Sequence, residues 1–181
     1  MKIIGIDPSL SSTGICIMNG EDVKYYLITS TPEPKRKIVE IPDNVEIIRF
    51  NRLEPKSTTE SKQDAILQIR NIIHEILIKE IVGDISIAIE GPSYNSKGNA
   101  YVDLFGLNYV IRLLCKDITH NWPQVIPPAC IKGLATGKGN AGKDMMVNAW
   151  LEEQGGMRNT KGMKLDDLCD SYWLVKKIQE N

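Results

Sequence analysis

Residues 2–19 read KIIGIDPSLSSTGICIMN, and this stretch decides the fold. It contains two runs of strand-forming residues, 2–7 and 13–19, joined by the segment PSLSS, whose proline and hydroxyl side chains favour a turn. A third run, VKYYLIT at 23–29, follows after a few polar residues. Three such runs with short links predict an antiparallel meander of three strands.

Beyond the meander, helix-like and strand-like segments alternate. Isoleucine and leucine recur at helical spacing over 60–80, which predicts an amphipathic helix, and the short apolar run 85–89 predicts a buried strand. We also expect a strand at 122–126 and helices at 99–117, 127–133, 142–153 and 166–179. This order predicts an α/β fold with a mixed five-stranded sheet, the meander plus parallel strands, flanked by helices.

The 181 residues are expected to form one domain, residues 1–181. Residues 31–60 hold four prolines among many charges and are interpreted as an insertion, with a short strand over 45–50 as one option. The apolar run at the start, MKIIG, is too short for a signal peptide, and no apolar stretch approaches the roughly 20 residues of a membrane span.

The four cysteines lie far apart in the sequence and form no C-x-x-C pair. This spacing favours neither a disulfide scaffold nor a zinc site. We therefore expect a cytoplasmic protein with reduced thiols and no membrane contact.

Four acidic residues stand at the ends of predicted elements, where they add nothing to core packing. Asp7 and Glu90 each end an apolar strand-like run, and the carboxyl ends of strands are where α/β sheets bind ligands. Asp167 and Asp170 lie three residues apart and share one face of a predicted helix. Crowded carboxylates repel one another unless protons or metal ions neutralise them, and hard oxygen ligands suit Mg²⁺ or Mn²⁺. The four acids predict a metal-dependent phosphoryl-transfer site.

Asp166 leaves the fourth ligand open, because Asp166 and Asp170 also share a helix face. Alternatively, Asp166 and Asp167 cap the helix and favour its positive end.

The net charge of −1 does not exclude a nucleic-acid partner, because the basic residues are unevenly distributed. Lys132, Lys138 and Lys143 lie in a stretch, 131–143, that contains no acid, and 154–165 is likewise free of acids. Residues 137–144, GKGNAGKD, nearly match the phosphate-loop pattern G-x-x-x-x-G-K-[ST]. An aspartate replaces the hydroxyl residue that binds Mg²⁺, which argues against a nucleotide site. Glycines and lysines in an acid-free loop still suit close approach to a phosphodiester backbone.

The loop GPSYNSKG follows Glu90 directly. Tyr94 in this loop could stack on an unpaired base or simply pack on the loop, and Lys97 is a further candidate DNA contact.

Taken in order, these segments resemble the RuvC family of Holliday-junction resolvases, within the RNase H-like nuclease superfamily. The segment from Ile6 to Gly14 is similar to the family's opening I-D-P-G-x-x-x-T-G, and AIE at 88–90 is similar to the strand with its second acid. KGNAGK at 138–143 resembles the basic loop G-K-G-x-A-x-K, and DLCDS at 167–171 resembles the ending D-x-x-D-A. Ser9 in place of glycine and Ser171 in place of alanine depart from the family pattern. The long 31–60 insertion suggests a divergent, phage-type branch, acting in the host cytoplasm.

The resemblance implies an RNase H-like fold and an endonuclease that cleaves four-way junctions, and other branched DNA, as a homodimer. It implies two Mg²⁺ ions per site, replaceable by Mn²⁺, and products with 5′-phosphate and 3′-hydroxyl ends. The implied metal ligands are Asp7, Glu90, Asp167 and Asp170, with Asp166 as the alternate. Lys143 joins the acids in catalysis, and the expected DNA contacts are Lys132, Lys138, Lys143, Tyr94 and Lys97. The apolar helix 99–117 is the expected interface between subunits.

Two other functions stay open. One is an actin-like or sugar-kinase-like ATPase, whose first phosphate loop also runs strand, aspartate, turn, strand, although such enzymes need two domains around the nucleotide. The other is a non-catalytic protein that binds branched DNA.

Overall fold

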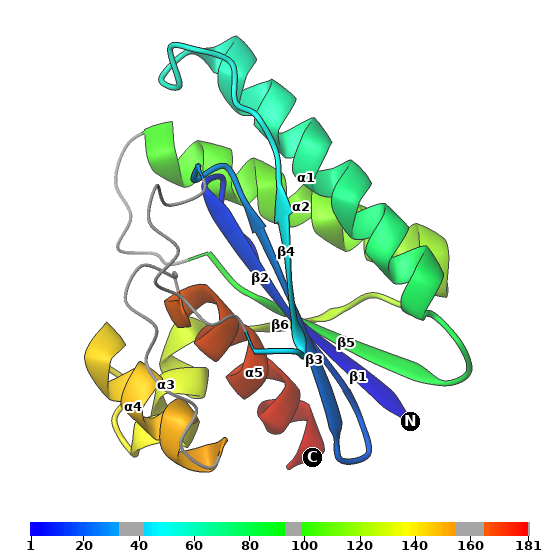
Figure 1. Ribbon diagram of the computed structural model, residues 1–181, viewed down its shortest axis with the longest axis vertical. Coiled ribbons are helices and arrows are strands. Elements are labelled where there is room, and N and C mark those ends of the chain that lie inside the picture. The colour runs from blue at the N-terminus through cyan, green and yellow to red at the C-terminus, as the bar shows by residue number, and fades with distance from the viewer. Residues whose placement is uncertain (33–41, 93–98, 155–164, 181) are drawn as a thin grey trace.

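The computed structural model describes residues 1–32, 42–92, 99–154 and 165–180. Its centre is a mixed sheet of six strands in the order β4-β3-β2-β1-β5-β6 (Figure 1). The strands are β1 (Lys2–Asp7), β2 (Ser12–Asn19), β3 (Asp22–Thr29), β4 (Val45–Arg49), β5 (Ile85–Glu90) and β6 (Gln124–Ile126). The first three form the predicted antiparallel meander, whereas β4, β5 and β6 each pair in parallel with a neighbour. The predicted α/β fold with a mixed sheet is confirmed.

The expected count of five strands was wrong by one. The sixth strand is β4, within the segment interpreted as an insertion, and it pairs in parallel with β3 through Tyr25 opposite Val45 to Thr29 opposite Arg49. Only Val45 of its five residues is buried, because β4 lies at the edge of the sheet. Such weak burial leaves little apolar pattern in the sequence.

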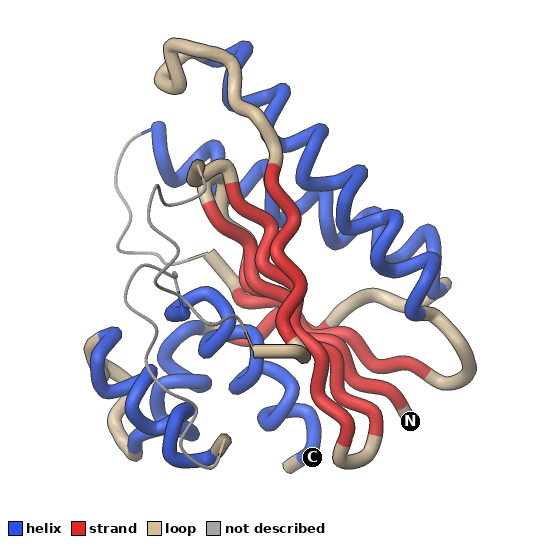
Figure 2. The backbone as a smooth tube through the Cα atoms, in the orientation of Figure 1, coloured by secondary structure: helices blue, strands red, loops and turns tan. Residues whose placement is uncertain are grey.

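In the described ranges, five helices cover the two faces of the sheet (Figures 1 and 2). One face packs against α1 (Thr59–Glu80) and α2 (Asn99–Thr119), and the other against α3 (Pro128–Thr136), α4 (Lys143–Glu153) and α5 (Leu165–Gln179). Neighbouring residues of one strand enter opposite cores: Ile3 belongs to the α5 side and Ile4 to the α1 side. The strands are apolar on both sides because both faces are covered.

The short helix α3 runs three residues past the predicted end at Gly133, which stays helical. The helix ends instead at Gly137, whose φ of 73° is the left-handed conformation that glycine adopts without strain. At the other end, Pro128 occupies the first turn, where its missing N–H costs no hydrogen bond.

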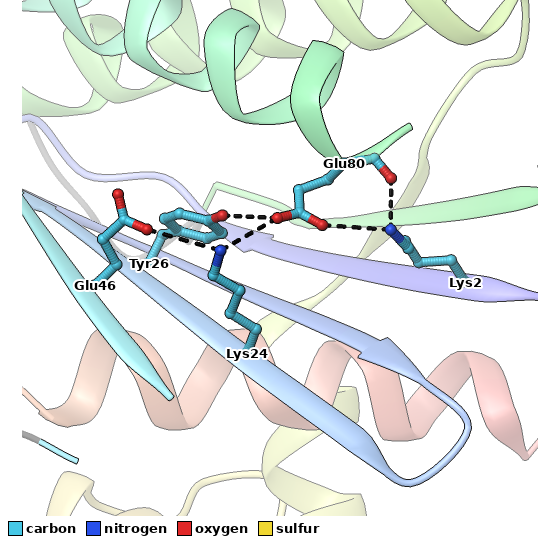
Figure 3. A network of polar contacts seen from close by, with 5 residues as sticks. All are labelled: Lys2, Lys24, Tyr26, Glu46 and Glu80. Carbon is cyan, nitrogen blue, oxygen red and sulfur yellow. Dashed lines mark hydrogen bonds and ion pairs between the residues drawn. The ribbon is translucent and has the colours of Figure 1, made fainter. Parts of the chain in front are cut away.

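A polar network fixes the end of α1 to the sheet (Figure 3). The Glu80 carboxylate accepts a hydrogen bond of 2.8 Å from the Tyr26 hydroxyl and lies 3.3 Å from the ammonium groups of Lys2 and Lys24. Lys2 also donates to the Glu80 backbone oxygen at 2.6 Å. These contacts join one helix to strands β1 and β3. Among the helices of the described ranges, none has the length and apolar character to cross a bilayer.

Candidate active site

Two strands bring the first pair of acids together. Asp7 ends β1 and Glu90 ends β5, and these strands are parallel neighbours with Ile6 opposite Ile89. The next residue of each strand is therefore an acid, and both leave the sheet at its carboxyl edge. Burial of the two isoleucines in the α1-side core fixes the register that places the acids side by side.

Helix α5 adds a third acid from above the same edge. One carboxylate oxygen from each of Asp7, Glu90 and Asp170 lies within 4.8 Å of the others. Two oxygens bound to one Mg²⁺ ion lie at most about 4.2 Å apart, so small side-chain rotations would let the three carboxylates share a cation. The charge of Asp167, three residues earlier, also acts on Asp7, although Asp167 is not part of this triad. The side chain of Asp166 lies outside the described residues.

Two glycines let α5 approach the sheet this closely. A Cβ on Gly5 of β1 would collide with the backbone oxygen of Ser171, and a Cβ on Gly14 of β2 would collide with that of Asp167. Any larger residue would hold the helix away from the strands. These two small positions thus set the depth at which the acids of α5 meet Asp7.

The turn after β1 is closed by its own side chains. The Ser9 amide donates to Thr13 Oγ1 at 3.1 Å, and the Thr13 hydroxyl donates to the Ser9 backbone oxygen at 2.9 Å. Ser9, expected as glycine in the resemblance, is accommodated in this turn and lines the pocket beside Asp7.

The acids are too crowded to be fully ionised without a counter-charge. The pKa of Asp7 is raised well above its ordinary value of 3.8, first by burial and then by the negative charge and hydrogen bond of Glu90 and the charges of Asp170 and Asp167. The pKa of Glu90 is also raised by burial, although its hydrogen bond with Asp7 and the charges of Lys132 and Lys143 oppose the rise. Bound divalent cations would remove this repulsion, so the donor set fits a cation of the Mg²⁺ type.

The acids lie in a pocket that also contains basic groups. Its wall includes Lys132 of α3 and Lys143, the first residue of α4, together with Ser9 and Asn108. The loop of residues 137–142 joins the two helices that carry these lysines. Lys138 is exposed in that loop and is not part of the wall. Tyr94 and Lys97 lie outside the described residues.

The sequence analysis missed Asn108. It lies in the middle of α2, is only 2% exposed, and donates from Nδ2 to the backbone oxygen of Glu90 at 2.7 Å. The signal was its helical spacing: Asn108 lies four residues after Leu104 and three before the buried Ile111, on the face of α2 turned to the protein.

Comparison with solved structures supports an RNase H-like fold, with a mixed sheet covered by helices on both faces. RuvC from Thermus thermophilus in complex with a Holliday junction substrate aligns with a TM-score of 0.61 and 15% identity over 97% of this chain and 90% of that chain. A second Thermus thermophilus RuvC structure aligns with a TM-score of 0.60 and 14% identity, over 97% and 91% of the two chains. The chain therefore has the RuvC fold. No family model matches the sequence, and no curated protein matches it.

Proposed function

We propose that the chain is a structure-selective endonuclease that cleaves four-way DNA junctions, and other branched DNA, by metal-dependent hydrolysis of a phosphodiester bond. The observation that carries this proposal is a single pocket, on a RuvC fold, in which carboxylates from β1, β5 and α5 face two lysines. Acids alone would repel a nucleic-acid backbone. Acids that hold metal cations, with two ammonium groups beside them, would instead attract a nucleic-acid backbone and polarise its phosphate.

Asp7, Glu90 and Asp170 would hold the metal ions, with Asp167 or Asp166 completing the set. Two Mg²⁺ ions, or Mn²⁺ in their place, would supply the charge that activates water and stabilises the leaving oxygen during in-line attack, giving 5′-phosphate and 3′-hydroxyl ends. Asp7 is buried, and the charges of the other three acids all act on it, so it would be the central ligand of the metal site. Glu90 and Asp170 would each contribute a carboxylate that helps to hold the ions.

The lysines would hold the DNA. Lys132 and Lys143 line the acid pocket, so their ammonium groups can meet the scissile phosphate and its neighbour. Lys143 also begins α4, and the N–H groups of a helix N-terminus favour an anion there. We assign Lys143 to charge neutralisation at the scissile phosphate and Lys132 to the backbone beside it. Lys138, Tyr94 and Lys97 remain proposed contacts farther along the strand.

We further propose a homodimer formed through α2. This helix exposes an apolar stripe: the exposed fractions of Val102, Phe105, Tyr109 and Leu113 are 66%, 39%, 45% and 50%. The spacing of three or four residues keeps the stripe on one face. The stripe is preformed by ring contacts, with centroids 5.7 Å apart for Tyr101 and Phe105 and 4.9 Å apart for Phe105 and Tyr109.

A second copy of the chain is the occupant that fits this stripe. A four-way junction has two-fold symmetry and requires paired cuts, and a two-fold dimer carries one active site for each cut. Two residues of the stripe, Phe105 and Tyr109, directly follow Leu104 and Asn108, which line the pocket from the same helix. Contact between two α2 helices would thus set the relation between the two sites.

The decisive experiment incubates the pure protein with labelled four-way junction, Y-fork and duplex DNA, first with Mg²⁺ and then with Ca²⁺. We expect paired nicks in the junction with Mg²⁺, binding without cutting in Ca²⁺, and little attack on duplex. Binding to the junction without nicks in either Mg²⁺ or Mn²⁺ would favour the non-catalytic alternative. Saturable ATP binding in a parallel titration, without DNA cleavage, would favour the ATPase alternative.

A further inference from the structure

Asn108 is a buried amide in a helix whose other buried side chains are mostly apolar. It is 2% exposed, and its neighbours on the same face, Leu107 and Ile111, are fully buried. A buried amide is costly unless its hydrogen-bonding groups are used. Asn108 lies on the wall of the acid pocket, which indicates that its hydrogen-bonding groups act at that site.

The hydrogen bond to Glu90 fixes how the amide is turned. A backbone oxygen only accepts, so the group 2.7 Å from the Glu90 oxygen must be the NH₂ of Asn108. The other end of the amide, Oδ1, is then an acceptor. It is buried, and within the described ranges it has no hydrogen-bond partner. A donor brought into the pocket, with water the smallest, would complete it.

Asn108 donates this hydrogen bond to Glu90, the acidic residue at the end of β5. On the far side, the Gly91 amide donates to the Ile126 oxygen of β6 at 2.9 Å. The backbone around Glu90 is therefore held between the edge strand β6 and α2.

We infer that Asn108 is a positioning residue: its NH₂ group holds the Glu90 backbone so that the carboxylate faces Asp7 and Asp170, and its Oδ1 accepts from water in the loaded site. This inference rests on the proposed metal-dependent function. Its consequence is that Asn108 acts on cation affinity and turnover through Glu90, without touching the DNA. Partners of this kind typically change metal affinity or activity by about 10–100-fold.

The test compares Asn108→Leu with Leu107→Val. The first removes both hydrogen-bonding groups while keeping the branched shape of the side chain, and the second trims the neighbouring side chain, which belongs to the α1-side core and not to the pocket. Three quantities are measured for each: the melting temperature without metal, the Mn²⁺ dissociation constant by calorimetry, and kcat and KM on a junction at saturating Mn²⁺. Asn108→Leu is expected to weaken Mn²⁺ binding and lower kcat by about 10–100-fold with KM unchanged within about twofold. Leu107→Val is expected to lower only the melting temperature.

Equal Mn²⁺ affinity and equal kcat in Asn108→Leu and wild type would overturn the inference and leave the proposed nuclease intact. A wild type that neither binds Mn²⁺ nor cuts junctions would overturn both. Should Asn108→Leu melt far below Leu107→Val, Asn108→Ala replaces it, because a smaller side chain at the pocket wall needs no room. Wild-type Mn²⁺ affinity in a folded Asn108→Ala would equally overturn the inference.

Discussion

Gly14 of β2 lies directly opposite Asp7 of β1 and directly against the backbone carbonyl of Asp167, with no room for even a methyl group in between. One residue without a side chain thus adjoins two of the proposed catalytic acids. The depth at which α5 packs on the sheet is set here and at Gly5, and with it the distance from Asp170 to Asp7 and Glu90.

Gly14→Ala is expected to lift the start of α5 and separate its acids from Asp7. We expect cleavage to fall by about 100-fold, the scale of an ångström-sized misplacement of catalytic groups, with a destabilisation of about 1–3 kcal/mol from overpacking. Single-turnover cleavage and thermal melting measure the two effects. Gly133→Ala is the matched control: its new Cβ meets open space within a helix, so stability should be unchanged or slightly higher. Wild-type cleavage by Gly14→Ala would show that the site tolerates a displaced α5.

Asp7→Asn is expected to reduce junction cleavage by at least about 100-fold, the scale for losing one group that stabilises transition-state charge. Junction binding in Ca²⁺ should be kept or tightened, because the change removes a negative charge and no basic contact. Gel-shift titration and cleavage under the same conditions separate the two effects. A cleavage rate within a few-fold of wild type would mean that Asp7 is not a metal ligand.

Lys143→Ala is expected to lower turnover by more than tenfold, with only a modest loss of binding, because the ammonium group acts on charge that develops at the phosphate. Lys138→Ala is the matched control, since Lys138 is exposed outside the pocket wall. It should leave turnover unchanged and reduce the salt dependence of binding by about one phosphate contact. Equal turnover in the two variants would show that Lys143, like Lys138, only contacts the DNA backbone and has no role in catalysis.

Phe105→Glu on the α2 stripe is expected to convert the proposed dimer into monomer, because a carboxylate in a desolvated interface lacks a partner. Sedimentation velocity over a range of concentrations measures the change. Leu67→Glu on α1, whose leucine is 58% exposed, is the control and should leave the mass unchanged. If the protein stays dimeric when Phe105→Glu is combined with a second charged substitution at Tyr109, the dimer interface lies on another surface.

Glu80→Gln is expected to change how stability depends on pH. Burial acts to raise the pKa of Glu80, but hydrogen bonds from Tyr26, Lys24 and Lys2 outweigh it, and the pKa lies below its ordinary value of 4.5. A carboxyl with a lowered folded-state pKa stabilises the fold above its ordinary pKa and loses that contribution as the pH falls through the lowered value. Urea unfolding from neutral to acidic pH should therefore show a shallower loss of stability in Glu80→Gln than in wild type. Parallel curves would show that ionisation of Glu80 adds nothing to stability over this pH range, despite the contacts drawn in Figure 3.

Much of the fold could be predicted because its strands have clear limits. Apolar runs that stop at Asp7 and at Glu90 predicted both strands and their acidic ends, and the parallel pairing of β1 with β5 brings those ends together. The edge strand β4 was harder, since it is mostly exposed or half-buried and residues 30–44 separate it from its partner β3 in the sequence.

The three lysines of the acid-free stretch look alike in sequence. Lys132 lies within α3 and Lys143 starts α4, and both line the pocket, whereas Lys138 lies in the loop between these helices. The three are therefore separated by where α3 ends and α4 begins, and the left-handed Gly137 marks the end of α3. Asn108 was missed for another reason. A polar residue in a helix is usually solvent-exposed, so its buried spacing was outweighed by its residue type.

The acid triad draws its members from the first strand, the middle of the chain and α5, which follows every other described element. On the ribosome, a nascent polypeptide therefore carries Asp7 and Glu90 long before α5 is available to dock. The complete triad, and any cation site that needs all three carboxylates, can therefore form only after α5 has been synthesised and has docked on the sheet.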